Sequence, residues 1–181
     1  MPIISGGGAA SLGSVTGVTG TAASGQVPVA SSSSASAWGY PPGFEIGYVQ
    51  ITAGVTIAST TEATGTTIIN MGALTFDGTA VLFHFFAPVV ACDGNALGNQ
   101  TTLSLFEGST QIGRIWTGNS QQATTLPRLG VSAFYRFTPS AASHTYTVTA
   151  FVTNATGSPN VGAGSGGTGA VVPAFGRFTK V

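Results

Sequence analysis

The segment "HTYTVTAFVT", residues 144–153, alternates between apolar and polar side chains along most of its length. In an extended chain, one face of this segment carries Tyr146, Val148, Ala150 and Val152, while the other carries mostly threonine. A period of two with β-branched and aromatic residues on the apolar side predicts a half-buried β-strand.

Other segments indicate strands in the same way. "VSAFYRF", residues 131–137, places Val131, Ala133, Tyr135 and Phe137 on one face, opposite Phe134 and Arg136. "TLSLFEGSTQIGRIW", residues 102–116, predicts a hairpin that turns at Glu107-Gly108-Ser109. Residues 80–87, "AVLFHFFA", are apolar on both faces apart from His84, which predicts a strand buried between two layers. We expect further strands at residues 46–52, 55–59, 66–70, 73–77 and 171–180.

The pattern as a whole indicates an all-β protein. No segment carries a helical apolar stripe of useful length, and the 27 glycines and nine prolines interrupt most apolar runs. Short strands separated by turn signals such as Asp77-Gly78 are typical of a β-sandwich or barrel, here with about ten strands. Longer loops are expected near residues 88–100, 117–130 and 153–170.

The distribution of charge divides the chain. There is no charged side chain before Glu45, and all ten lie from Glu45 onward. We interpret residues 1–44, which are rich in Gly, Ser and Ala, as an extended arm, and residues 45–181 as the folded domain. Extended chain can add to the edge of a sheet through main-chain hydrogen bonds, and aromatic residues supply contact area at low entropy cost. The arm is therefore predicted to dock on a partner through Val27, Val29, Trp38 and Tyr40.

The composition limits the classes of function. Only 6% of the 181 residues are charged, and the net charge is zero, which favours self-association and burial in an assembly. Five scattered cations do not form the basic patch that nucleic acids require. No apolar run approaches the roughly 20 residues needed to span a bilayer, and the first residues lack the features of a secretory signal peptide. The single Cys92 cannot form an internal disulfide.

Residues suited to catalysis are few. Of the two histidines, His84 is expected to be a hydrogen-bonded core imidazole, and His144 a solvated or interface residue. The five carboxylates have no paired spacing that would indicate a glycosidase. Residues 162–167, "GAGSGG", formally match a dinucleotide motif, but no helix follows them. "CDGN", residues 92–95, offers calcium one carboxylate and is better interpreted as a turn. We expect no enzymatic activity, no cofactor and no metal.

The C-terminal stretch "VPAFGRFTKV", residues 172–181, resembles the closing strand of the tumour-necrosis-factor and C1q jelly rolls. In those families an aromatic-Gly-x-aromatic stretch runs beside a threefold axis. The resemblance implies a jelly-roll β-sandwich that forms a homotrimer, with Phe175, Gly176 and Phe178 at the trimer interface.

Nearly the whole domain resembles small virion structural proteins of tailed bacteriophages, particularly those that infect actinobacteria. The resemblance rests on residues 62–90, 103–116 and 135–157 and on the terminal strand. The arm, from "VTGTAASGQVPVASSSSASAW" at residues 18–38, is similar to Gly/Ser/Val-rich elements of tail-fibre proteins that tend to form trimeric β-structure. Together they imply a non-enzymatic protein that is assembled in the host cytoplasm and displayed on the exterior of the virion.

Within this class, the first expectation is a capsid decoration protein or head fibre, docked through its arm on the major capsid protein or another virion protein. The alternative is a minor tail, tail-tip or fibre protein whose distal loops bind host-surface glycans during adsorption. For that alternative, the candidate ligand-binding residues are Trp116, Asn119, Gln121 and Gln122, although packing at a strand end is the more ordinary role for Trp116. The sequence leaves open the position in the virion, the copy number and the receptor.

Overall fold

The structure, a computed structural model, describes residues 21–22, 24–30, 36–92, 98–119, 128–154 and 158–181. The chain divides into two compact units, Met1–Pro41 and Pro42–Val181. The boundary predicted from the distribution of charge lies three residues later, between residues 44 and 45.

The second unit is built from β-strands, and no helix occurs in the parts of the chain that the structure describes. The strands of this unit are β3 (Glu45–Ile51), β4 (Val55–Thr56), β5 (Thr66–Thr75), β6 (Val81–Ala91), β7 (Gln100–Glu107), β8 (Thr110–Asn119), β9 (Arg128–Phe137), β10 (Ser143–Val152), β11 (Asn160–Gly162) and β12 (Ala174–Lys180). The prediction of an all-β fold is confirmed.

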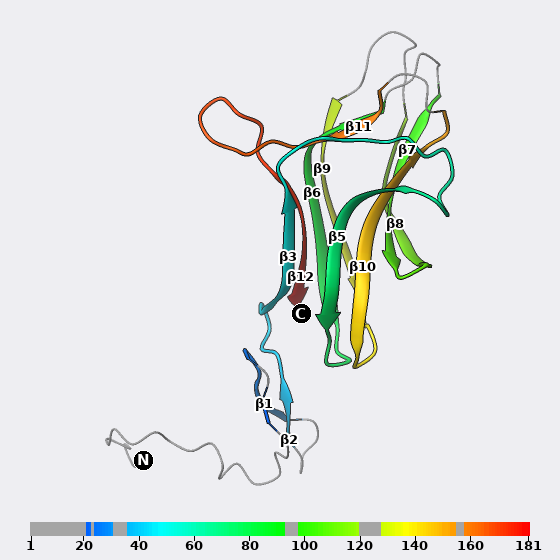
Figure 1. Cartoon of the computed structure of the whole chain (residues 1–181). Helices are drawn as coiled ribbons and strands as arrows, with labels where there is room; N and C mark the ends of the chain where they lie inside the picture. Colours follow the sequence, from blue (N-terminus) through cyan, green and yellow to red (C-terminus); the bar gives the residue numbers. More distant parts are fainter. Residues whose placement is uncertain (1–20, 23, 31–35, 93–97, 120–127, 155–157) are drawn as a thin grey trace. The chain divides into compact units, whose positions relative to one another are not determined.

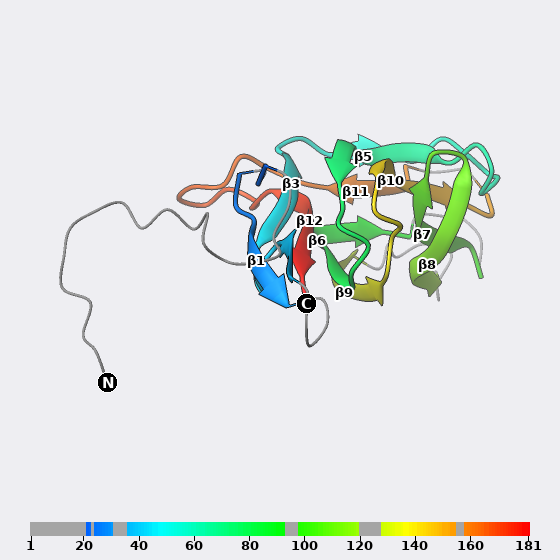
Figure 2. The same ribbon diagram turned by 90° about the horizontal axis from the view of Figure 1, so that it is seen from below.

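Two antiparallel sheets form the sandwich (Figure 1). One sheet has the order β5–β10–β7–β8, and the other runs β3–β12–β6–β9, with the short strands β11 and β4 beside the far half of β6. Along the chain, the eight long strands therefore pair as 1-8-3-6 and 2-7-4-5, which is the connectivity of a jelly roll. Figure 2 views the strands nearly end-on, and the two sheets can be followed as separate layers.

The core lies between the sheets and is rich in aromatic rings. Phe178 packs against Phe83, with ring centroids 4.8 Å apart, and against Tyr146, at 4.9 Å. Phe76 meets the rings of both Tyr146 and Phe178 edge-on, at 5.5 Å. The alternation predicted for the first quoted segment is confirmed, because its apolar residues are fully buried: Tyr146, Val148, Ala150 and Val152.

The hairpin predicted around Gly108 is also confirmed. Glu107 pairs with Thr110, so Gly108 and Ser109 form a two-residue turn between β7 and β8. Gly108 has a φ of +56°, and a glycine with positive φ at this first turn position suits the twist of the two strands.

The two strands predicted at 66–70 and 73–77 are in fact one strand, β5. Gly72 does not break the strand but takes a φ of +67°, and the Oδ1 atom of Asn70 accepts a hydrogen bond from its N–H at 2.9 Å. The pairing with β10 shifts here, since Tyr146 pairs with Gly72 but Thr147 with Asn70. Met71 is thus the extra residue of a β-bulge, a feature that bends a strand without ending it.

The prediction that residues 80–87 are buried on both faces is wrong. In β6 the residues at odd positions (Val81, Phe83, Phe85, Ala87) are fully buried, whereas the even ones on the outer face are half-buried. β6 also continues past Pro88 to Ala91, because Pro88 falls where the pairing with β9 shifts register between Ala87 and Val90. A proline, which has no N–H to donate, is tolerated at such an irregularity. Of the shorter predictions, 55–59 is a strand only at Val55–Thr56, and 171–180 only from Ala174.

The first unit contains a small hairpin where an extended arm was expected. β1 (Val27–Ala30) pairs antiparallel with β2 (Ser36–Gly39), with Val27 opposite Gly39 and Pro28 opposite Trp38. Within the described residues, these strands pair only with each other. Across the described ranges, no helix is long and apolar enough to cross a bilayer.

Candidate interaction surface

The outer face of the β3–β12–β6–β9 sheet, which points away from the second sheet, carries a cluster of aromatic side chains. One row of directly paired residues crosses the sheet through Tyr48, Arg177, His84 and Phe134. His84 lies flat on Phe134, with ring centroids 4.2 Å apart and 16° between the planes. Contacts of this kind between side chains on neighbouring strands stabilise a sheet.

A second row of paired residues lies two positions away along the strands, on the same face. Phe175 of β12 is opposite Gln50 of β3 and Phe86 of β6. The Phe175 ring stacks with Phe86 at 5.4 Å, contacts Tyr48 at 5.5 Å, and meets His84 edge-on at 5.0 Å. Phe175 is therefore the centre of the cluster, which we call the aromatic face: Tyr48, His84, Phe86, Phe134 and Phe175.

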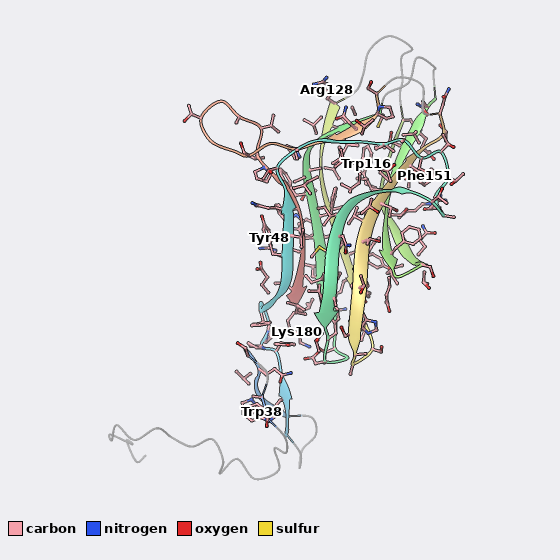
Figure 3. The ribbon with its side chains drawn as sticks, viewed as in Figure 1. Trp38, Tyr48, Trp116, Arg128, Phe151 and Lys180 are labelled. Atoms are coloured by element: carbon pink, nitrogen blue, oxygen red, sulfur yellow. The ribbon has the colours of Figure 1, made fainter. Side chains whose placement is uncertain are left out.

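This face exposes apolar surface to a degree unusual for a sheet. Phe134 is 61% exposed and Tyr48 is 44% exposed, and Figure 3 shows Tyr48 on the outer side of β3. The cations on the face are Arg177 and Arg136, and neither forms an ion pair with any described residue. The face is therefore apolar and weakly cationic, a composition typical of an interaction surface.

His84 is not the core residue that was expected. It is half-buried on the outer face, and its Nε2 atom lies 3.1 Å from the Ser132 hydroxyl. Its Nδ1 atom is buried and has no hydrogen-bond partner among the described residues. Burial, and after it the positive charge of Arg177, lower the pKa of His84. The imidazole is therefore neutral at pH 7, as suits a ring stacked on the apolar Phe134.

The three residues predicted at the trimer interface do not lie on one surface. Phe175 belongs to the aromatic face, whereas Phe178 is fully buried in the core of the same chain. Gly176 also points inward, and a Cβ there would come within 2.9 Å of the Met71 sulfur and 3.4 Å of Phe83. The placement of Phe178 and Gly176 at the interface is therefore corrected, because adjacent strand residues face opposite sides. Of the three, Phe175 alone has its side chain available to a second copy.

The candidate ligand-binding loop is only partly described. Trp116 lies opposite the buried Leu103, packs against the core cluster and is half-buried, and Figure 3 shows it between the sheets. Packing against the core is therefore its observed role. Asn119 lies at the end of β8, where its Oδ1 atom accepts a hydrogen bond from Gln100 at 3.2 Å. Gln121 and Gln122 lie outside the described residues.

The residues predicted to dock the arm lie on the two paired strands and just after them. Val27 is 39% exposed in β1, and Trp38 is half-buried in β2. Tyr40, which directly follows β2, is buried. Val29 lies in β1, opposite Ala37.

His144 joins a cluster that sequence reasoning missed. Its Nδ1 atom lies 2.6 Å from Glu107 Oε1, and its side chain is 13% exposed, so it is not simply solvated. Its Nε2 atom lies 3.1 Å from the Ser140 hydroxyl and 3.0 Å from the Ser140 carbonyl oxygen. The order serine–histidine–carboxylate is that of a hydrolase triad. However, Nε2 must carry a proton to bond the carbonyl, so it has no lone pair for the hydroxyl proton, and the arrangement favours a structural clamp.

Two other potential sites are unremarkable. Burial raises the pKa of the Cys92 thiol, so it stays protonated and unreactive at neutral pH. Asp93 and Asn95 lie outside the described residues, within which no group of three or more potential metal ligands comes together.

Two comparisons by sequence found no relative of this chain. No protein-family model matches the chain, and no curated protein sequence matches it significantly. The fold and the aromatic face are therefore the basis for reasoning about function.

Proposed function

We propose that this chain is a non-enzymatic, homotrimeric structural protein of a tailed-bacteriophage virion, displayed on the capsid surface and anchored through its N-terminal unit. The resemblance of the domain to small virion proteins suggests the class. The resemblance of the terminal strand to C1q-like jelly rolls suggests the threefold arrangement.

The proposal that the chain associates with copies of itself rests on the aromatic face. Phe134 and Tyr48 expose 61% and 44% of their surface beside Phe175, which makes a connected apolar patch. Patches of this kind on soluble proteins mark interaction sites. The chain has zero net charge, so copies of it do not repel one another at long range. These properties favour a second copy as the partner of this face.

The N-terminal hairpin supports anchoring on another chain. It has two strands of four residues each, and an isolated two-stranded hairpin is at best marginally stable in water. Its outer edges leave main-chain groups that can pair with strands of another chain. The sequence of this unit has no charged side chain that would obstruct such pairing.

The clamp at His144 supports a role other than catalysis, because its Nε2 proton is held by the Ser140 carbonyl. The buried thiol of Cys92 supports the same view.

The deciding experiment measures where the chain is and how many copies it has. Purified virions are separated into heads and tails, and the chain is quantified in each by mass spectrometry, while sedimentation equilibrium of the purified protein gives its oligomeric state. Many copies in heads, together with a trimer in solution, are expected. A monomer absent from virions would overturn the proposal.

A few copies in the tail fraction would favour the second candidate, a minor tail or fibre protein that binds host-surface glycans. One observation favours that candidate, namely a polar hollow on the sheet opposite the aromatic face.

A further inference from the structure

A hollow of about 340 Å³ lies on the outer face of the β5–β10–β7–β8 sheet. The segment between β4 and β5 forms one wall, where Glu62 reaches β7 and β8 by hydrogen bonds. On the side of the sheet, the hollow is lined by residues of β10, β7 and β5. The side chains that matter for binding are Glu62, Thr64, Thr67, Phe106, Thr147 and Thr149. This volume is at the small end of ligand-binding pockets, so a ligand would be correspondingly small.

Glu62 is held rigidly beside this hollow. Its Oε1 atom accepts hydrogen bonds from Ser104 at 2.6 Å, from Gln111 at 2.6 Å and from Arg114 Nε at 2.9 Å. Its Oε2 atom accepts one from Arg114 Nη2 at 2.6 Å. The hydrogen bond from Arg114 is the main reason that the pKa of Glu62 is lowered, so the group stays a carboxylate well into the acid range.

One acceptor position of Glu62 remains open. A carboxylate oxygen has two lone pairs, and within the described residues Oε2 accepts only from Arg114. Nearby, the hydroxyls of Thr67, Thr147 and Thr149 make no hydrogen bond within the described part of the chain. Each hydroxyl can both donate and accept. The hollow therefore offers three hydroxyls fixed by strands and a carboxylate fixed by its hydrogen bonds, which is the arrangement that a binding site needs.

The chemistry of these groups selects the ligand class. Arg114 neutralises Glu62, so the hollow has no net charge with which to attract an ion. A phosphate would be repelled by the carboxylate, and a metal ion would find a single carboxylate, whose negative charge Arg114 already balances. A ring bearing several hydroxyls suits the site, because it can donate to Glu62 and both donate to and accept from the threonines. Phe106 also lines the hollow, and although it is only 8% exposed, its ring edge adds an apolar contact for carbon atoms of such a ring.

We propose that this hollow is a carbohydrate subsite that takes one neutral hexopyranose unit, with Glu62 Oε2 accepting a hydroxyl and the threonines of β5 and β10 bonding its neighbours. This inference does not depend on trimer formation or on the position of the protein in a virion. The site is on the sheet opposite the aromatic face, so association through that face leaves it open.

The test uses the full chain, isotopically labelled, and two-dimensional NMR during titration with the methyl glycosides of glucose, galactose, mannose, rhamnose and N-acetylglucosamine. At least one sugar should shift amide signals of Gly65, Gly108 and Thr147, with a dissociation constant on the order of millimolar, since a ligand with so few atoms cannot bind tightly. No shift with any of these sugars at high millimolar concentration would overturn the proposal.

A matched pair of variants tests the location. Thr147→Val removes a hydroxyl that lines the hollow and should weaken binding about 3- to 10-fold, the value of one lost hydrogen bond. Thr145→Val makes the same change two residues earlier on the same face of β10, outside the hollow, and should leave binding unchanged. Equal weakening in both variants, or shifts confined to the aromatic face, would overturn the proposal. The dispersion of the amide spectrum shows whether each variant is folded.

Discussion

The imidazole of His84 and the ring of Phe134 lie stacked on the outer face of the sandwich, with centroids 4.2 Å apart. The two residues are directly opposite each other on β6 and β9. The surroundings of the stack favour a neutral imidazole, because a proton on His84 would place a second positive charge beside Arg177 in a partly desolvated position. The proposed association through the aromatic face would therefore depend on pH.

Association through this face is predicted to weaken in acid. The pKa of His84 in the free folded chain is already lowered from its ordinary value of 6.5, and burial between copies would lower it further. As the pH falls, the free chain would then take up the proton before the associated chain does. Association is therefore expected to have its full strength above about pH 6.5 and to weaken below it, by at most tenfold in the equilibrium constant per pH unit and per chain. Sedimentation equilibrium across this range measures it, and an equal slope in His84→Phe would contradict the assignment to His84.

The two phenylalanines of β12 are predicted to have separate roles. Phe178→Ala should lower the free energy of unfolding by about 3–5 kcal/mol, because it empties a large volume of the core. Phe175→Asp should leave the sandwich folded and abolish the proposed trimer, because it places an unpaired charge in the proposed interface. Chemical denaturation and sedimentation equilibrium are measured on both variants. An intact trimer in Phe175→Asp would exclude the aromatic face as the interface.

A buried ion pair near the end of β12 is predicted to matter for stability. Lys180 Nζ lies 3.3 Å from Asp77 Oδ1, and the two side chains are only 8% and 12% exposed. Lys180→Met leaves the carboxylate without its cation and should cost about 3–5 kcal/mol of unfolding free energy. Adding Asp77→Asn should recover part of this loss, as a double-mutant cycle would show.

The control for this pair is Arg128→Met, which alters an exposed cation at the start of β9 and should change stability by no more than about 0.5 kcal/mol. If Lys180→Met were as harmless as this control, the pair would have no structural importance.

Local patterns in the sequence predicted the sandwich well, for a physical reason. The period of two in residues 144–153 must place Tyr146 and Val148 on the same face, and a glycine after Glu107 suits a tight hairpin. The same rule would have separated Phe175 from Phe178, which are three residues apart and so face opposite sides of β12. The motif resemblance grouped them instead, and that grouping was wrong for Phe178.

Features that depend on the distant pairing of strands could not be read from the sequence. Tyr48, Phe175 and His84 come together only because β12 inserts between β3 and β6. Glu62 meets Arg114 across 52 positions of chain, through a hydrogen bond that no local spacing encodes. Gly72 suggested the end of a strand, because glycine is typical both of a β-bulge and of a break between strands. Only the pairing with the partner strand distinguishes the two.

The N-terminal unit is predicted to be dispensable for folding and required for incorporation into the particle. The chain separates into compact units between Pro41 and Pro42, and the core residues of the sandwich all lie after that point. A chain lacking residues 1–41 should therefore keep its β-type circular dichroism and melt within a few degrees of the full chain, because it loses none of that core. It should fail to join virions when it is supplied in place of the full chain, since the hairpin that would pair with another chain is gone. The measurement is quantitative mass spectrometry of purified particles, with the full chain as the control. Normal incorporation of the shortened chain would mean that docking resides in the sandwich, and a shortened chain that does not fold would mean that the two units are not independent.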